Sequence, residues 1–277
     1  MHKIIFFLTS DTFILSVVQS ITEFLPVSST AHLHLIRTML WKGAAASSSQ
    51  ITLQYLALHI GTILAVMVYF KNYFIRFLRL SFKPSFTQTL RWQLVVATLP
   101  IICAGLFLKN GLMGNVQNNL LLMACNLIGF GVLLYISDTV SDDSKLVGNL
   151  TYKDAFFIGC AQCLSLLPGV SRSGITMTAG RFCGLKRKDA TRFSLLLSVP
   201  TVMAATGWVF FKLATQKHTY PWELVDTQFC LSVALTFLGG LIAIHTLTRW
   251  VKTHSFLVFM LYRFGLGLAL LWMLGVI

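Results

Sequence analysis

Long hydrophobic runs separated by short polar loops make up most of the chain. A helix needs about 20 mostly apolar residues to cross a bilayer. Six runs reach or approach that length: 53–70, 92–108, 119–138, 193–211, 229–247 and 256–277. Pro100 and Pro200 lie inside two of these runs, which membrane helices tolerate when neighbouring groups satisfy the freed backbone. The pattern therefore predicts about six transmembrane helices.

Two further apolar regions are each interrupted by a polar turn. In the first, arms at 4–18 and 31–40 flank the stretch QSITEFLPVSSTAH. In the second, arms at 155–168 and 177–185 flank PGVSRSGIT. The arms are too short to span a bilayer, and irregular backbone at membrane depth is tolerated only where protein or a wet cavity shields it. We therefore expect two re-entrant helix–loop–helix hairpins.

The two polar turns are also an internal repeat. A shift of 143 residues aligns Gln19 with Gln162, Val27 with Val170, Ser28 with Ser171, Ser29 with Arg172 and Thr30 with Ser173. Each half then consists of one hairpin followed by three spans, and because three is odd the second half must insert upside down. We expect residues 1–277 to form a single membrane domain with repeat halves 1–140 and 150–277. Such an inverted-topology repeat places a site at the repeat interface near mid-membrane.

Composition supports the same fold class, an all-α integral membrane protein. Hydrophobic residues make up 56% of the chain and charged residues 11%, and the mean hydropathy is +0.74. Soluble domains have about 25% charged residues. The net charge of +13 lies mainly in short loops, which favours topology signals and anionic lipid headgroups and argues against nucleic acid as a partner.

The basic residues also predict an orientation. Most Lys and Arg residues fall in the loops 71–91, 138–154, 181–192 and 249–255. The positive-inside rule places these loops in the cytoplasm and both termini outside. The first hairpin would then enter from the outer face and the second from the inner face. The active site would open to the outer, periplasmic side.

Glu23 and Arg172 are charged residues within the two polar turns. A charge at membrane depth costs at least about 2.5–3.5 kcal/mol and usually marks a functional path or a paired site. One interpretation is a buried ion pair that fixes the packing of the two hairpins. The other is that both side chains are catalytic, and their neighbours favour it.

Hydroxyl, glycine and histidine residues surround the two charges. Gly-rich turns that open a helix direct N–H groups toward an anion, and Arg adds a bidentate fork for phosphate oxygens. Ser29 and His32 are three residues apart and can meet on a helical turn, so His32 could activate Ser29 as a nucleophile. Attack by His32 itself or by a metal-bound water stays open. Residues that we expect to contact substrate phosphate are Ser28, Thr30, Gly169, Ser171, Arg172, Ser173 and Thr176.

A divalent cation fits the same chemistry. Mg²⁺ prefers few protein ligands together with substrate phosphates, and Glu23 can supply a carboxylate. An anion clamp, a metal, a nucleophile and a proton shuttle are the components of phosphoryl transfer. We therefore expect dependence on Mg²⁺ or Ca²⁺.

Other polar residues within the spans have simpler interpretations. His59 and His245 are expected to be satisfied packing residues. Arg263 could snorkel to the cytoplasmic headgroups or line the central cavity. His34 and Arg37 lie near the outer end of the first hairpin and could meet lipid phosphate.

The motif EFLPVSSTAH preceded by Gln19, together with LLPGVSRSGIT, resembles the two signature regions of the undecaprenyl-diphosphate phosphatase family of the bacitracin-resistance type. The likeness extends through YLALHIGTILAVMVYF and FSLLLSVP, and so over essentially the whole chain. The family's first motif, Glu or Gln and then Glu four positions later, fits Gln19 and Glu23 and implies that both lie at the metal. Gln19 leaves one carboxylate fewer than members with Glu there. The second motif, Pro-Gly-x-Ser-Arg-Ser-x-x-Thr, fits the positions from Pro168 to Thr176.

The resemblance implies hydrolysis of a C55 polyprenyl diphosphate to its monophosphate and inorganic phosphate. It also implies a place in the bacterial inner membrane, recycling of the lipid carrier for peptidoglycan synthesis, and bacitracin resistance. The catalytic residues would be Ser29, His32, Glu23 and Arg172. The partners would be the lipid substrate and membrane lipids, and a homodimer stays open. The alternative function is a polyprenyl-phosphate or anion transporter, because inverted repeats with crossed hairpins are also transporter architecture.

Overall fold

The computed structural model describes residues 11–40, 48–78, 86–108, 116, 119–215 and 226–276. The start of the first apolar arm, before residue 11, lies outside the described residues. Within the described ranges the regular structure is helical, apart from an isolated β-bridge between Lys145 and Leu185. The helices are α2 (Asp11–Thr22), α3 (Ser29–Leu40), α4 (Ser48–Tyr69), α5 (Lys71–Leu78), α6 (Phe86–Phe107), α8 (Leu120–Val140), α9 (Tyr152–Gln162), α10 (Arg172–Phe182), α11 (Arg187–Thr215), α12 (Thr227–Trp250) and α13 (Leu257–Met273), with short 3₁₀ turns η1 (Val147–Asn149) and η2 (Cys163–Leu166).

The long apolar helices confirm the predicted spans. Within the described residues, five helices are long and apolar enough to cross a membrane: Ile51–Tyr69, Thr89–Phe107, Leu120–Val140, Arg187–Leu213 and Thr227–Trp250. The sixth predicted run forms α13, which has only 17 residues because the chain leaves the helix before Gly275, whose φ is +68°. The chain is therefore an all-α membrane protein.

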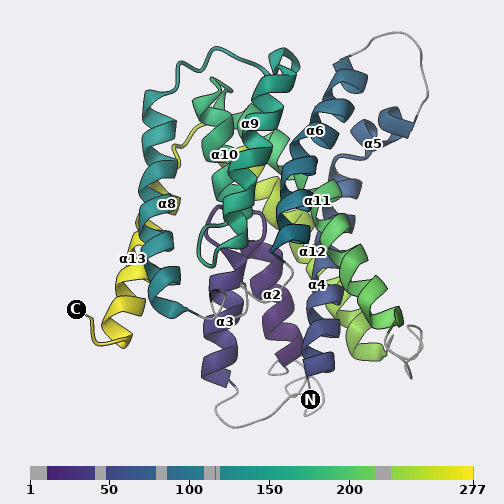
Figure 1. Cartoon of the computed structure of the whole chain (residues 1–277), viewed down its shortest axis with the longest axis vertical. Helices are drawn as coiled ribbons and strands as arrows, with labels where there is room; N and C mark the ends of the chain where they lie inside the picture. The colour runs from purple at the N-terminus through teal and green to yellow at the C-terminus, as the bar shows by residue number, and fades with distance from the viewer. Residues whose placement is uncertain are drawn as a thin grey trace.

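Two helix–turn–helix hairpins enter the bundle from opposite ends (Figure 1). Helices α2 and α3 form the first hairpin at the end that holds the N-terminus, and α9 and α10 form the second from the other end. Ser28 and Ser171, which the 143-residue shift aligns, have φ values of 73° and 71°. Positive φ is uncommon for residues other than glycine, so the two turns share an unusual backbone conformation.

The helices around the hairpins also pack in matched pairs. Helix α2 lies against α12, and α9 lies against α6. Small residues allow both close approaches: a Cβ at Gly239 would lie 2.4 Å from the Ser20 hydroxyl, and one at Gly159 would lie 2.5 Å from the Ala97 carbonyl oxygen. Small residues serve the same purpose at helix interfaces of membrane proteins generally.

Arg263 of α13 ties the two hairpin turns to the rest of the bundle. Its side chain is fully buried and donates hydrogen bonds to four backbone carbonyls: Leu127 at 3.1 Å, Pro26 at 3.3 Å, Asn126 at 3.2 Å and Gly169 at 3.0 Å. The expectation that Arg263 snorkels to the headgroups is therefore wrong. Its donors instead bind the Pro26 and Gly169 carbonyls of the two hairpin turns and two carbonyls of α8.

A second buried arginine, Arg181, lies at the end of the bundle opposite the N-terminus. Its Nε is 3.2 Å from Asp138 Oδ1, one terminal nitrogen contacts the Asp143 carboxylate, and the other donates to the Asp138 carbonyl at 3.0 Å. Asp138 also accepts from Arg187 at 2.8 Å and from the backbone N–H of Phe256 at 2.9 Å. This cluster connects α8, α10 and α11 to the start of α13.

Candidate active site

The two hairpin turns meet through side chains near the centre of the bundle. Arg172, the first residue of α10, places a terminal nitrogen 3.2 Å from Glu23 Oε1. The Ser173 hydroxyl donates to the Leu25 carbonyl at 3.0 Å. The predicted pairing of a carboxylate in one hairpin with an arginine in the other is thus confirmed. Both charges are largely withdrawn from solvent, with side chains 8% and 11% exposed.

Glu23 collects donors from three different segments. Because it follows directly after α2, its carboxylate points back over the last turn, where Gln19 Nε2 donates to Oε2 at 3.1 Å. The Ser29 hydroxyl, at the start of α3, donates to the same oxygen at 2.8 Å. With Arg172 on Oε1, both carboxylate oxygens are held in fixed directions.

Two buried polar atoms at this site have no hydrogen-bond partner among the described residues: Gln19 Oε1 and Arg172 Nε. The amide orientation of Gln19 follows from chemistry, because only its NH₂ group can donate to the carboxylate of Glu23. A buried polar group without a partner costs roughly 1–3 kcal/mol. An acceptor and a donor left open beside one ion pair indicate a place for a ligand that supplies the missing contacts.

The predicted contact between Ser29 and His32 is wrong. The Ser29 hydroxyl points toward the turn and donates to Glu23, whereas His32 Nδ1 lies 2.7 Å from the Ser28 carbonyl and Nε2 lies 2.6 Å from the Tyr262 hydroxyl. Side chains on a helix lean toward its N-terminus, and for Ser29 that direction is the carboxylate. Since a carbonyl only accepts, His32 carries its proton on Nδ1 and receives the Tyr262 O–H at Nε2.

Most hydroxyls of the second hairpin face the protein. Ser171 caps α10 by accepting from the Gly174 N–H at 3.1 Å, and Thr176 contacts the Arg172 carbonyl and the Ser194 hydroxyl at 2.9 Å and 2.6 Å. The turn at Gly169 admits only glycine, because its φ is +86° and a Cβ would lie 2.4 Å from the Met123 carbonyl oxygen. These residues hold Arg172 in place. The sequence predicts that they contact substrate phosphate directly, whereas in the structure the Ser171 and Thr176 hydroxyls bond to other protein groups.

A cavity of about 500 Å³ adjoins the ion pair. Residues from the first hairpin, from α4 and from the turn of the second hairpin line it: Gln19, Ser29, Thr30, Leu33, His34, Arg37, Tyr55, His59, Met123, Ser165, Leu166, Leu167 and Pro168. Of the predicted catalytic and phosphate-binding residues, Ser29 and Thr30 therefore reach the cavity, together with Gln19. Ser28 lies behind them, with its hydroxyl 3.3 Å from that of Thr30.

His59 is the site residue that sequence reasoning missed. Its Nδ1 lies 2.8 Å from the Tyr55 carbonyl, so the neutral ring carries its proton there and keeps a lone pair on Nε2. His59 follows YLAL in a run that otherwise reads as a plain span, and a histidine in such a run is the only signal that sequence offers. Arg37 lies over the Tyr55 ring at 4.4 Å and contributes positive charge to the same cavity.

The donors present suit a cation that arrives with its substrate. Among the described residues there is no group of three or more His, Cys, Asp and Glu side chains that could hold a metal ion. Mg²⁺, however, is usually bound by one or two carboxylates plus substrate phosphates and water. The Glu23 carboxylate and the unpartnered Gln19 Oε1 fit that pattern.

Comparison with known proteins gives a consistent result. A family model described as bacitracin resistance protein BacA matches residues 12–269. The chain is 36% identical to an undecaprenyl-diphosphatase of Syntrophobacter fumaroxidans, covering 94% of this chain and 95% of the relative. It is 34% identical to an undecaprenyl-diphosphatase of Alteromonas mediterranea (95% and 97% covered) and 35% identical to one of Corynebacterium diphtheriae (96% and 94%).

Proposed function

The chain belongs to the BacA family, and we propose how its crossed hairpins carry out the family's reaction. It hydrolyses undecaprenyl diphosphate to undecaprenyl phosphate and inorganic phosphate, which recycles the lipid carrier for peptidoglycan synthesis and gives resistance to bacitracin. The observation that carries the mechanism is the Ser29–Glu23–Arg172 network, of which Ser29 lines the cavity. Nothing in the described residues favours the transporter alternative.

Arg172 binds the terminal phosphate of the substrate. Among the described residues its Nε has no hydrogen-bond partner, and its terminal nitrogens donate to Glu23 and, at 3.3 Å, to the Ser194 carbonyl. A guanidinium can hold two phosphate oxygens through parallel N–H bonds. Phosphate oxygens that approach from the cavity complete the coordination that the protein leaves open.

Ser29 is the nucleophile, and Glu23 accepts its proton. The serine oxygen attacks the terminal phosphorus while the O–H proton passes along the existing 2.8 Å hydrogen bond to Glu23. The bond between that phosphorus and the bridging oxygen breaks, and its electron pair leaves on undecaprenyl phosphate. Because a phosphate monoester is a good leaving group, this step needs no strong general acid.

His59 serves the second step, in which water releases the phosphate from Ser29. Its Nε2 lone pair can take a proton from the attacking water, and the serine oxygen regains its proton from Glu23. Water must enter the cavity for this step, and the His34 and Arg37 side chains keep its wall polar. His32 has a positioning role, since it holds the Ser28 carbonyl directly before Ser29.

A divalent cation, Mg²⁺ or Ca²⁺, would be held by Glu23 and Gln19 together with the diphosphate. When bound, it neutralises charge on the substrate in a site of low dielectric. In the membrane we place both hairpins as re-entrant elements of an inverted repeat. The cavity then opens on the periplasmic side of the inner membrane, the side opposite the loops richest in Lys and Arg.

Rapid-quench kinetics test the two-step mechanism. Purified protein in detergent with Mg²⁺ should release one equivalent of undecaprenyl phosphate in a burst before steady state. His59→Gln should keep that burst and accumulate phosphate on Ser29, whereas Ser29→Ala should abolish it. A single-phase reaction with no phosphoenzyme in either protein would assign the attack to water. Full activity after dialysis against EDTA would remove the cation from the mechanism.

A further inference from the structure

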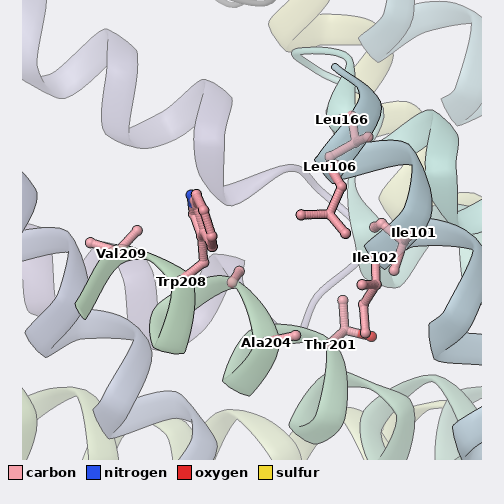
Figure 2. A pocket seen from close by; sticks show the side chains of 10 residues that line it. Ile101, Ile102, Leu106, Leu166, Thr201, Ala204, Trp208 and Val209 are labelled. Atoms are coloured by element: carbon pink, nitrogen blue, oxygen red, sulfur yellow. The ribbon is translucent and has the colours of Figure 1, made fainter. Parts of the chain in front are cut away.

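An apolar groove of about 380 Å³ lies between α6 and α11 (Figure 2). Ile101 and Leu106 lie on one wall and Trp208 and Val209 on the other, with Leu166 beside Leu106. No charged residue lines the groove. The one hydroxyl on its wall, that of Thr201, donates inward to Gln162 Oε1 at 3.2 Å. The groove is therefore apolar, and its volume falls in the usual range of about 300–1,000 Å³ for ligand sites.

The groove and the catalytic cavity share one lining residue, Leu166. This residue, the last of η2, lines both spaces, while its neighbours Ser165, Leu167 and Pro168 line the cavity alone. One turn of the second hairpin thus lies between the cavity, which carries charged and polar residues, and the apolar groove. A chain that leaves the cavity beside Leu166 meets the wall of the groove on the same residue.

We propose that the α6/α11 groove binds isoprene units of the polyprenyl tail that follow the first one. The proposal rests on the proposed function, which places the diphosphate against Ser29 and Arg172. The cavity wall carries His34, Arg37 and His59 besides its apolar residues, so a tail left there would bury part of its apolar surface against polar groups. In the groove the same carbons exchange lipid or water contacts for Ile101, Leu106 and Trp208.

A second apolar groove, between α4 and α11, provides an internal comparison. It has a similar volume of about 360 Å³ and lies between Leu56 and Ile60 of α4 and Met203 and Phe210 of α11. It shares no lining residue with the catalytic cavity, whose α4 residues are Tyr55 and His59. By composition either groove could hold a hydrocarbon chain. The shared lining residue Leu166 places the α6/α11 groove next to the cavity and favours it over the α4/α11 groove.

Two glycines allow each groove to be filled without disturbing the protein. Gly105 lines the α6/α11 groove and Gly207 the α4/α11 groove, and a Cβ at either position meets nothing within 4 Å. Gly129 of α8 has equally open surroundings and lines neither groove. All three lie inside helices, where replacing glycine favours the helix. Gly105→Leu, Gly207→Leu and Gly129→Leu therefore form a matched set.

The experiment compares kcat/KM for undecaprenyl diphosphate with kcat/KM for dimethylallyl diphosphate, which has a single isoprene unit. Gly105→Leu should lower the ratio of the two constants about tenfold, the scale of a lost apolar contact in a pocket, while Gly207→Leu and Gly129→Leu leave it unchanged. An unchanged ratio in Gly105→Leu, or a fall in Gly207→Leu, would overturn the proposal. Wild-type protein that releases phosphate from neither substrate would refute the proposed function instead.

Photo-crosslinking gives a second measurement that does not depend on Gly105→Leu folding. A benzophenone amino acid in place of Ile102, which is 37% exposed in the groove, should form an adduct with undecaprenyl diphosphate. The same group in place of Leu64, 40% exposed in the α4/α11 groove, should not. Excess dimethylallyl diphosphate should compete poorly. Adduct at Leu64 alone, or at neither position, would contradict the assignment.

Discussion

Two buried arginine–carboxylate sites differ in how completely their polar atoms are satisfied. At the Arg181–Asp138 cluster, every terminal nitrogen of the arginine and both carboxylate oxygens of the aspartate have protein partners, and the arginine Nε, which makes no hydrogen bond among the described residues, still lies 3.2 Å from Asp138 Oδ1. At the Glu23–Arg172 pair, Arg172 Nε and the adjacent Gln19 Oε1 have none among the described residues. The second pair adjoins a cavity of about 500 Å³.

The difference shows how to distinguish an ion pair that stabilises the fold from one that takes part in substrate binding and catalysis. In the Arg181 cluster the charged atoms already contact protein groups, so a ligand would have to displace existing contacts. In the Glu23–Arg172 pair, polar atoms without hydrogen bonds raise the free energy of the unliganded protein. A diphosphate with its cation can supply the missing hydrogen bonds and so removes that free-energy cost on binding. The two sites should therefore respond in opposite ways to mutation.

Arg181→Met should mainly cost stability. Removing one member of a buried pair typically costs about 3–5 kcal/mol. Here the carboxylate of Asp138 would keep only Arg187 as a cationic partner, so the cost should lie at the lower end of that range. We expect a large fall in the detergent melting temperature, with kcat per folded molecule close to wild type. Normal stability in this variant would mean that water reaches Asp138 and that the cluster does not stabilise the packing of the helices.

Arg172→Lys should mainly cost activity. Lysine keeps the charge opposite Glu23 but loses the planar fork, so we expect kcat/KM to fall by at least about 10²-fold while the melting temperature changes little. Arg172→Ala should be only slightly worse in turnover. If the lysine variant keeps near-normal turnover, Arg172 is a counter-charge for Glu23 and the open Nε has no role.

Gln19→Glu should increase the affinity of the site for Mg²⁺. A second carboxylate beside Glu23 replaces the amide that now donates to it, so the pair would bind Mg²⁺ more tightly. We expect the Mg²⁺ concentration for half-maximal activity to fall about three- to tenfold, in line with a stronger oxygen ligand. Gln162→Glu, at the aligned position in the second hairpin, is the control and should leave the Mg²⁺ requirement unchanged.

Tyr262→Phe should have the smallest effect. It removes the hydroxyl that donates to His32 Nε2 and leaves the contact from His32 Nδ1 to the Ser28 carbonyl intact. Because His32 lies outside the cavity lining, we expect kcat to change less than about threefold, far below the 10²-fold or more typical of a lost acid–base group. A larger loss of kcat, with a shifted pH profile, would mean that His32 takes part in acid–base catalysis.

The hairpins and the ion pair could be anticipated from the sequence because they follow from local pattern and a repeat. Short apolar arms around Pro- and Ser-rich turns predicted helix–turn–helix pairs, and the 143-residue shift aligned Ser28 with Ser171, which share an unusual backbone conformation. Glu23 and Arg172 are charged residues in apolar surroundings, and this alone predicted that they form an ion pair. These inferences need only the cost of exposing polar groups to hydrocarbon.

The direction of each side chain was not predictable. Sequence spacing allowed Ser29 to meet His32, but the start of α3 turns the hydroxyl to Glu23. Arg263 looked like a snorkelling residue because its depth in the span was known and its neighbours were not. His59 looked like a packing residue for the same reason.

The sequence by itself determined that the chain is a helical membrane protein with two polar hairpins and that the charged residues of their turns pair. These properties follow from transfer free energies, which depend on the residues and their order. Only the tertiary structure decided which polar atoms lack partners, where the cavity lies and that it shares Leu166 with the groove. Those features arise from contacts between segments more than a hundred residues apart, and no local pattern encodes the geometry of such contacts.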